Sequence, residues 1–215
     1  MPGQLLELKI TPPPLQPRLL PRPKLLELLN SELMSNGSFH RKLTLVTAPA
    51  GYGKTSIVRQ WLAEHSERVA WYSLDDTDSD PSRFWLYFLS ALGKVAPVGQ
   101  STLQTLSAPS LSQMSIDRDK LIGLLNELAN LETPLFLVLD DFHLIEDQTV
   151  SDNLAFLIER LPPTVHIVVI TRYDPDWPLA HWQAKRHLLT LSQSYLRFSD
   201  QEAATLFNDV PLGRN

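Results

Sequence analysis

The sequence predicts an α/β fold, a doubly wound parallel sheet of about five strands with flanking helices. Three observations predict it. Short apolar runs alternate along the chain with segments of helical period. One run, Leu135 to Leu139, is uninterrupted, as expected for a strand buried on both faces. Polar residues follow three of the runs, at the carboxyl ends where such sheets bind ligands.

The composition limits the classes of protein to which this chain can belong. The chain has 215 residues, of which 43% are apolar and 20% charged, enough for one large domain or for one domain and part of another. A formal charge of −5 and only small basic clusters argue against nucleic-acid binding by this segment itself. There is no cysteine, no apolar run of the ~18–20 residues that cross a membrane, and no signal-peptide pattern at the start. We therefore expect a cytoplasmic protein without disulfides or membrane association.

Residues 1–37 are expected to form a lead-in and one helix that packs near the site described next. Prolines dominate the first part and predict extended backbone, in which Lys9 and Ile10 could form a short edge strand. Pro23 suits the first position of a helix, and leucines then recur at helical spacing. The Asn-Gly pair at 36–37 would end that helix.

The stretch Ala-Pro-Ala-Gly-Tyr-Gly-Lys-Thr at 48–55 follows an apolar run at 43–47 and leads into a segment of helical period at 56–65. A strand, a glycine-bearing loop ending in Lys-Thr, and a helix together predict a phosphate-binding loop. The glycines let main-chain N–H groups turn toward a polyphosphate, and the helix adds its own N-terminal N–H groups and dipole. The residues expected to bind the nucleotide here are Ala50, Gly51, Tyr52, Gly53, Lys54, Thr55 and Ser56.

Within this loop, Lys54 brings a positive charge to the β- and γ-phosphates, and the Thr55 hydroxyl can bind Mg²⁺. The usual pattern is G-x-x-x-x-G-K-[ST], and this chain has Ala48 where the first glycine stands. The alternative is a glycine turn that only joins a strand to a helix. The motif indicates a sheet of the P-loop NTPase type that binds ATP or ADP with Mg²⁺.

Strands and helices continue to alternate after the loop. Helices are expected from Pro81 through Leu92, at 117–131 and at 150–161, strands at 69–74, 135–139, 166–170 and 187–191, and a loop or insertion at 96–115. We interpret the acidic run at 75–80 as a solvated turn with helix-capping residues rather than a metal site. The five tryptophans are expected in the core or in partner contacts.

A capping box at Ser199 to Glu202 predicts a last helix through Phe207. We expect the core of the nucleotide-binding domain to span 38–195. Residues 196–215 are expected to begin a following helical domain that is cut short.

Two carboxylates follow the apolar run at 135–139. Asp140 is expected to hold Mg²⁺ together with Thr55. Asp141 could orient or deprotonate a water that attacks the γ-phosphate, which would make it the catalytic base. The alternative is a simple turn, in which aspartates are common.

Arg172 follows the neighbouring strand, at 166–170. Its guanidinium could bind the γ-phosphate through paired hydrogen bonds and lose them after hydrolysis. The alternative is an ion pair with Asp174 or Asp176.

Several segments resemble one known family. They are Leu45-Val-Thr-Ala-Pro-Ala-Gly-Tyr-Gly-Lys-Thr55, Ala70-Trp-Tyr-Ser-Leu-Asp75, Asp80-Pro-Ser-Arg-Phe84, Leu139-Asp-Asp-Phe-His-Leu-Ile145 and Leu196-Arg-Phe-Ser199. Together they resemble the amino-terminal ATPase of MalT-like regulators, the large ATP-binding LuxR-family transcriptional activators of bacteria. These belong to the signal-transduction ATPases with numerous domains (STAND). The similarity extends from about residue 15 to 207.

The resemblance implies a switch that holds ADP in a resting form and ATP plus an inducer in an active, self-associating form. It implies that Arg22 contacts the nucleotide near its base, although Pro21 replaces the family's usual glycine. Arg172 matches the family's strand-end arginine. The family's sensor repeats and carboxy-terminal helix-turn-helix are not in this segment, so we expect the full-length protein to bind DNA elsewhere.

Three functions remain open at this point. The first is an ATP-binding regulatory switch with slow hydrolysis. The second is a P-loop kinase acting on a small molecule, although no Arg-rich lid segment is evident. The third is an interaction module that has lost its nucleotide, against which Lys54, Thr55 and Asp140 argue. GTP is less expected than ATP because no Asn-Lys-x-Asp segment occurs.

Overall fold

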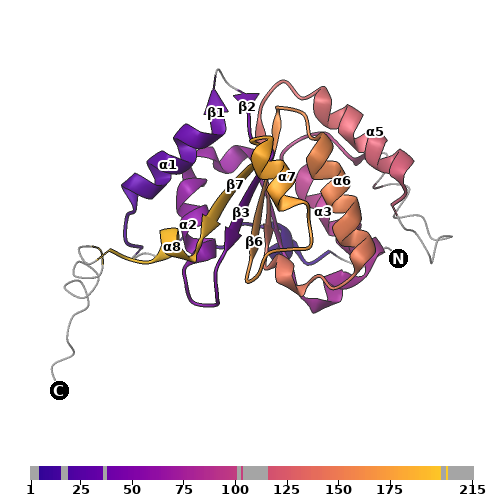
Figure 1. The fold of residues 1–215 in the computed structure, drawn as a ribbon. Helices are drawn as coiled ribbons and strands as arrows, with labels where there is room; N and C mark the ends of the chain where they lie inside the picture. Colours follow the sequence, from indigo (N-terminus) through magenta and orange to yellow (C-terminus); the bar gives the residue numbers. More distant parts are fainter. Residues whose placement is uncertain are drawn as a thin grey trace.

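The computed structural model describes residues 5–15, 19–35, 38–100, 103, 116–199 and 202. Its centre is a parallel sheet (Figure 1). The sheet has five strands in the order β4-β5-β6-β3-β7. The strands are β3 (Leu43–Thr47), β4 (Val69–Ser73), β5 (Leu135–Asp140), β6 (Val165–Thr171) and β7 (Leu188–Ser192). The predicted doubly wound parallel sheet is confirmed.

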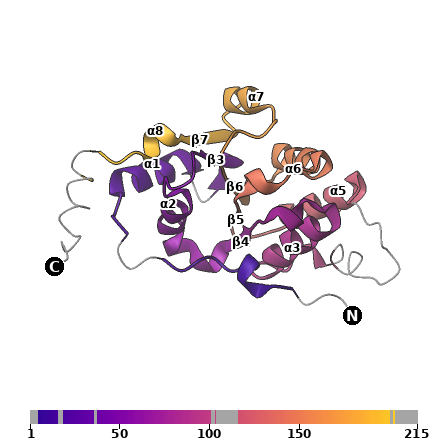
Figure 2. The ribbon, with the colours of Figure 1, turned by 90° about the horizontal axis from the view of Figure 1, so that it is seen from below.

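Helices cover both faces of this sheet (Figure 2). One face packs against α1 (Pro23–Leu33) and α2 (Lys54–Trp61), the other against α3 (Pro81–Gly93), α5 (Arg118–Ala129) and α6 (Gln148–Arg160). Neighbouring residues of β3 alternate between the two layers, so that Leu45 belongs to the α3 side and Val46 to the α2 side. Because both faces are covered, every residue of β5 and β6 is buried.

The sheet register brings the ends of separate strands together. Thr47 of β3 pairs with Thr171 of β6, and Ser73 of β4 pairs with Asp140 of β5. The strands are parallel, so the loops that follow β3, β5 and β6 leave from the same edge of the sheet. That edge is where the sequence places the phosphate loop, the two aspartates and Arg172.

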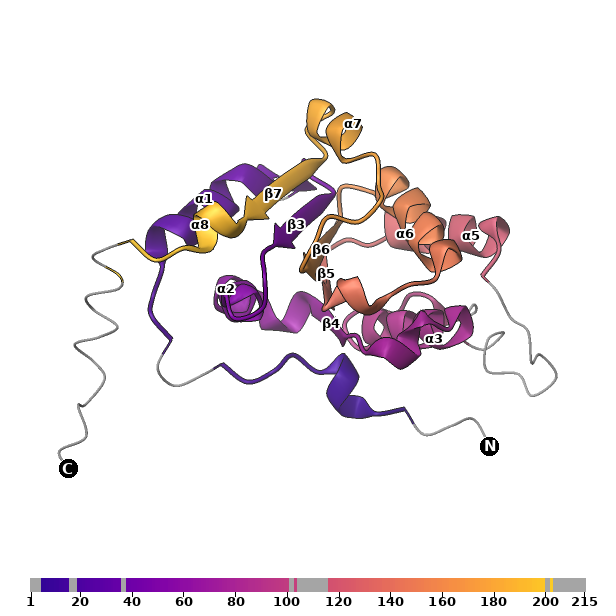
Figure 3. The same ribbon diagram turned by 60° about the horizontal axis from the view of Figure 1, so that its bottom comes forward.

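The N-terminal segment differs from its prediction. Lys9 and Ile10 do not form an edge strand but belong to the 3₁₀ helix η1 (Glu7–Ile10), which contacts the edge strand β4. Figure 3 shows this segment running past β4 along the edge of the sheet. The cause is the Lys9 side chain, which is buried and forms ion pairs with Asp75 and Asp78.

The acidic run at 75–80 is only partly as predicted. Its capping function is confirmed, because Asp75 accepts a hydrogen bond from the Thr77 amide and Asp80 accepts one from the Arg83 amide. Its description as solvated is wrong for Asp78, which is fully buried and pairs with Lys9 and Arg83.

Several short elements were not predicted. The helix expected at 56–65 ends at Trp61 and is followed by the 3₁₀ helix η2 (Ala63–Arg68). The others are the hairpin of β1 (Met34–Ser35) and β2 (Ser38–Phe39), the 3₁₀ helices η3 (Asp76–Ser79) and η4 (Phe142–Leu144), and the helices α7 (Leu179–Ala184) and α8 (Gln193–Leu196). Among the described residues, no helix combines the length and apolar character needed to span a bilayer.

Two further predictions are confirmed. Ser199 and Glu202 exchange the hydrogen bonds of a capping box, from the Ser199 amide to the Glu202 carboxylate and from the Glu202 amide to the Ser199 hydroxyl. All five tryptophans are buried in the core. The Asn-Gly pair at 36–37, most of the loop at 96–115 and the helix through Phe207 lie outside the described residues.

Candidate nucleotide-binding site

The loop between β3 and α2 has the backbone of an anion cradle. Gly51 and Gly53 have φ angles of +83° and +71°, and Gly53 is the N-cap of α2. A Cβ atom at either glycine would meet open space, so the positive φ, not a lack of room, favours glycine there. The helix N-terminus that follows leaves its first N–H groups free of helical partners.

Lys54 folds back over this loop. Its ammonium donates hydrogen bonds to the main-chain oxygens of Ala48 (2.8 Å) and Pro49 (3.1 Å), and only 8% of the residue is exposed. Burial lowers the Lys54 pKa, with a contribution from the nearby positive charge of Arg172 and an opposing one from Asp141. The ammonium therefore lies where it can exchange two neutral carbonyls for phosphate oxygens.

Thr55 and Asp140 meet at one point. The Thr55 hydroxyl donates to the Asp140 Oδ1 at 3.0 Å. Burial, followed by the negative charge of Asp141, raises the Asp140 pKa to about 7, although the Thr55 hydrogen bond opposes this. A buried carboxylate beside a hydroxyl is an oxygen donor pair that suits Mg²⁺, which would supply the missing counter-charge. The residues present therefore fit this metal.

Asp141 differs from its neighbour in environment. It has a left-handed backbone (φ 62°), which is uncommon outside glycine, and its side chain is 50% exposed. Its Oδ1 lies 3.8 Å from the Nδ1 of His143, whose ring is buried. Of the two adjacent carboxylates, one is enclosed and the other can reach water.

Arg172 lies at the same edge of the sheet. It is exposed, and within the described part of the chain it forms no ion pair with Asp174 or Asp176. Asp174 instead accepts a hydrogen bond from the Thr47 hydroxyl at 3.0 Å. The Arg172 charge contributes to lowering the pKa of both Lys54 and His143, behind the larger effect of burial in each case. Arg172 directly follows Thr171, which pairs with Thr47 at the end of β3, so Arg172 lies beside the start of the phosphate loop.

Arg22, predicted to lie near the base, is held by the C-terminal part of the described chain. Its guanidinium donates to the main-chain oxygens of Tyr195, Leu196 and Arg197 at 3.0–3.1 Å and to the Glu202 carboxylate at 3.0 Å. The three main-chain oxygens belong to the carboxyl end of α8 and its C-cap residue. Arg22 thereby joins the start of α1 to the segment that follows the sheet.

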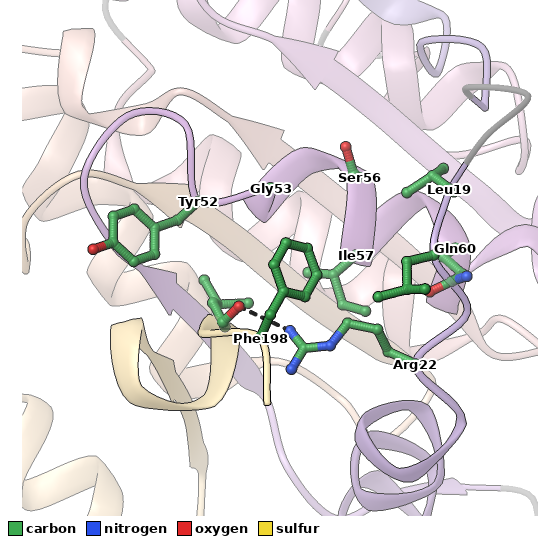
Figure 4. A pocket seen from close by; sticks show the side chains of 10 residues that line it. Leu19, Arg22, Tyr52, Gly53, Ser56, Ile57, Gln60 and Phe198 are labelled. Atoms are coloured by element: carbon green, nitrogen blue, oxygen red, sulfur yellow. Dashed lines mark hydrogen bonds between the residues drawn. The ribbon is translucent and has the colours of Figure 1, made fainter. Parts of the chain in front are cut away.

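Two adjoining cavities border the phosphate loop on the α2 side. The smaller, about 60 Å³, is lined by residues of 19–22, 52–60 and 196–198 (Figure 4). The larger, about 360 Å³, is lined by 50–53 and 196–198. Tyr52, Gly53, Leu196 and Phe198 line both. Arg22 therefore borders the same space as the loop, from the opposite side.

Residues 18–170 match the family model described as the AAA ATPase domain. The chain belongs to this family. It is 34% identical over 173 residues to the HTH-type transcriptional regulator MalT of Cronobacter sakazakii, covering 80% of this chain and 19% of that protein. It is 32% identical over 200 residues to MalT of Vibrio cholerae, covering 93% and 21%. The predicted resemblance to MalT-like regulators is confirmed, and the chain spans about a fifth of their length.

A solved structure gives the same fold for this AAA ATPase domain. Cdc6p of Pyrobaculum aerophilum superposes with a TM-score of 0.55 at 16% identity, covering 95% of this chain and 53% of that chain. At this identity the likeness concerns the fold alone. The sheet with its phosphate loop is therefore of the P-loop type that the motif predicts.

Sequence reasoning about this AAA ATPase domain missed several residues that build the site. Gln193 of α8 donates a hydrogen bond to the Tyr52 hydroxyl at 2.8 Å, and Tyr173 donates one to the His143 main-chain oxygen at 2.7 Å. Phe198 packs over the Arg22 guanidinium, 5.4 Å from its ring centre. The missed residues are Gln193, Tyr173 and Phe198, and only Phe198 lies in a segment that resembles the family, which is the signal that could have pointed to it.

Proposed function

We propose that this AAA ATPase domain is the ATP-binding regulatory switch of a MalT-like, LuxR-family transcriptional regulator, with slow Mg-dependent ATP hydrolysis. One observation carries the proposal. The glycine loop with Lys54, the Thr55–Asp140 pair and Arg172 lie at one edge of a single parallel sheet. Residues far apart in sequence thus lie together at one place, where they would provide phosphate binding, metal binding and a positive charge for the γ-phosphate.

Each group would have one function. The main-chain N–H groups of the loop and the Lys54 ammonium would bind the β- and γ-phosphates. Thr55 and Asp140 would hold Mg²⁺, which when bound supplies positive charge to the phosphate oxygens. Asp141, exposed beside them, would orient a water and accept its proton. Arg172 would bind the γ-phosphate and release it after hydrolysis.

The cavity geometry supports a switch. The nucleotide would enter a space bordered by the phosphate loop, by Arg22 and by Phe198 of the C-terminal segment. Its occupancy would therefore affect the segment that leads out of the domain. Following the resemblance, DNA binding and self-association would belong to the full-length cytoplasmic protein, since this segment has a charge of −5.

Calorimetric titration with Mg-ATP and Mg-ADP, together with phosphate release from ATP alone, tests the proposal. We expect saturable binding of both nucleotides at one site and slow phosphate release that needs no acceptor. The kinase alternative, which the family match does not support, predicts turnover only when a small-molecule acceptor is added. The absence of nucleotide binding would overturn the proposal.

A further inference from the structure

A nucleotide in this site can extend in only one direction from the phosphate loop. The γ-phosphate must lie toward Asp140, Asp141 and Arg172, because these carry the metal, base and sensor functions of the proposed reaction. The ribose and base must then lie on the other side of the loop. There the two cavities begin, lined in part by Tyr52 and Gly53 of the loop itself.

The smaller cavity has the chemistry of a site for a flat ring. Its walls include the apolar side chains of Leu19, Ile57, Leu196 and Phe198. Such a site needs a small number of polar groups to orient its ligand. Figure 4 shows that one of them, Gln60, lies on α2 beside Ile57.

The geometry of α2 aligns Gln60 with the phosphate loop. Gly53, Ser56, Ile57 and Gln60 follow the spacing i, i+3, i+4, i+7 and therefore share one face of the helix. Seven residues of helix span about 10 Å. This is comparable to the distance from the phosphates of a nucleotide to the far edge of its base.

The Gln60 carboxamide contains a buried oxygen without a partner. Its Oε1 atom is inaccessible to solvent and accepts no hydrogen bond from the described residues. Leaving a buried acceptor unpaired is unfavourable, so a ligand that donates a hydrogen bond here would relieve the penalty.

The other polar groups of the cavity are less suited to accept this bond. Arg22 can only donate, and its guanidinium is already held by main-chain oxygens at 195–197 and by Glu202. The Tyr52 hydroxyl already accepts a hydrogen bond from Gln193. Ser56 lies in the first turn of α2, next to the phosphate loop.

We propose that Gln60 recognises the 6-amino group of adenine and thereby makes the domain selective for adenine nucleotides. This inference rests on the proposed nucleotide binding and adds the residue that reads the base. The Oε1 atom accepts a hydrogen bond from the amino group, and the carboxamide N–H can donate to N7, as glutamine does with adenine elsewhere. Guanine presents two acceptors, O6 and N7, at the same edge, so no orientation of the carboxamide can satisfy both.

Titrations with Mg-ATP, Mg-GTP and the Mg complex of purine riboside triphosphate, which lacks the amino group, test the assignment. We expect the wild type to bind ATP about tenfold more tightly than purine riboside triphosphate, as for one hydrogen bond. In Gln60→Met, which keeps the side-chain length, the affinities for ATP and for purine riboside triphosphate should differ by less than about twofold. Gln60→Glu keeps an acceptor and should retain the preference. The control Gln183→Leu, on exposed α7, should behave as wild type.

The outcomes separate this inference from the function on which it rests. Two results would overturn the assignment to Gln60 while leaving nucleotide binding intact. One is a wild type that binds ATP and purine riboside triphosphate equally, and the other is a Gln60→Met variant that keeps the full preference for ATP over purine riboside triphosphate. GTP binding as tight as ATP binding would overturn the selectivity. A wild type that binds no triphosphate would overturn the proposed function itself. Circular dichroism checks that each variant is folded.

Discussion

At the scale of single residues, the site depends on a difference in burial between two adjacent carboxylates, Asp140 and Asp141. Asp140 is enclosed, bonded to Thr55, and has a pKa raised to about 7 by burial and by the Asp141 charge. Asp141 leaves the strand through a left-handed backbone and is half exposed. The enclosed carboxylate suits a metal ion that neutralises it, and the exposed one suits contact with water.

This division gives a prediction for Asp141→Asn. We expect phosphate release from Mg-ATP to slow by about 100-fold, as for loss of a general base, while ATP affinity changes by less than about threefold. Calorimetry and a phosphate assay on the same preparation provide the two values. The control Asp176→Asn removes a nearby exposed carboxylate and should change neither. Equal losses of binding and hydrolysis would reject the base role.

His166 makes stability depend on pH. It is fully buried, and its ring nitrogens lie 2.9 Å from the Arg41 main-chain oxygen and 2.9 Å from the Thr44 hydroxyl. Burial lowers its pKa to about 3, so the neutral ring is the folded form. The unfolded state takes up a proton below pH ~6.5, so stability is complete above that pH and falls as pH drops toward 3.

From pH 7.5 to 5.5 we expect His166 to contribute a loss of about 1.4 kcal/mol in the free energy of unfolding. Urea denaturation at both pH values measures it. In His166→Gln the loss should be smaller by that amount, because the other histidines are unchanged. An equal loss in wild type and variant would show that His166 is not buried in its neutral form.

Some of these residues could be predicted from the sequence and others could not. Lys54, Thr55 and Asp140 follow from local order, since a strand, a loop and a helix fix where each lies. The exposure of the Asp141 side chain and the unpaired Gln60 oxygen are properties of the three-dimensional packing, which local sequence order does not encode. No local pattern marks Gln60, which by sequence is one polar residue in an amphipathic helix.

At the scale of elements, burial decides which predictions succeed. The strands of the sheet are apolar over nearly their whole length, and their positions agree with prediction within about two residues. The short helices η1 and α8 have no periodicity of their own. They are held by tertiary contacts, such as that of Lys9 with Asp78 and that of Arg22 with the carboxyl end of α8.

The Lys9–Asp78 pair gives a prediction at this scale. Asp78→Asn leaves the buried Lys9 ammonium with Asp75 as its remaining carboxylate partner. We expect a loss of about 3 kcal/mol in the free energy of unfolding, as when one member of a buried ion pair is removed. The matched control is Asp76→Asn, an exposed carboxylate two residues away, which should lose less than about 0.5 kcal/mol by urea denaturation. Similar losses in both variants would contradict the burial of this pair.

At the scale of the whole molecule, the fold brings the residue that precedes α1 and the segment that follows α8 together beside the nucleotide site. Arg22 and Glu202 are 180 positions apart and form an ion pair at 3.0 Å. Between them, the sheet places the phosphate loop, Asp140 and Arg172 at one edge. The predicted limits of the nucleotide-binding core, 38–195, remain predictions. The cavity beside the phosphate loop is also lined by residues outside these limits, such as Arg22 and Phe198.

The measurement that tests the central claim most directly is nucleotide binding by Lys54→Ala. The ammonium makes charge-assisted contacts with two phosphates in the proposed complex, so we expect affinity for Mg-ATP to fall by about 100-fold or more. The circular dichroism spectrum should be unchanged, because Lys54 bonds only two loop carbonyls in the described chain. Wild-type affinity in a folded Lys54→Ala variant would contradict the assignment of this loop as the phosphate site.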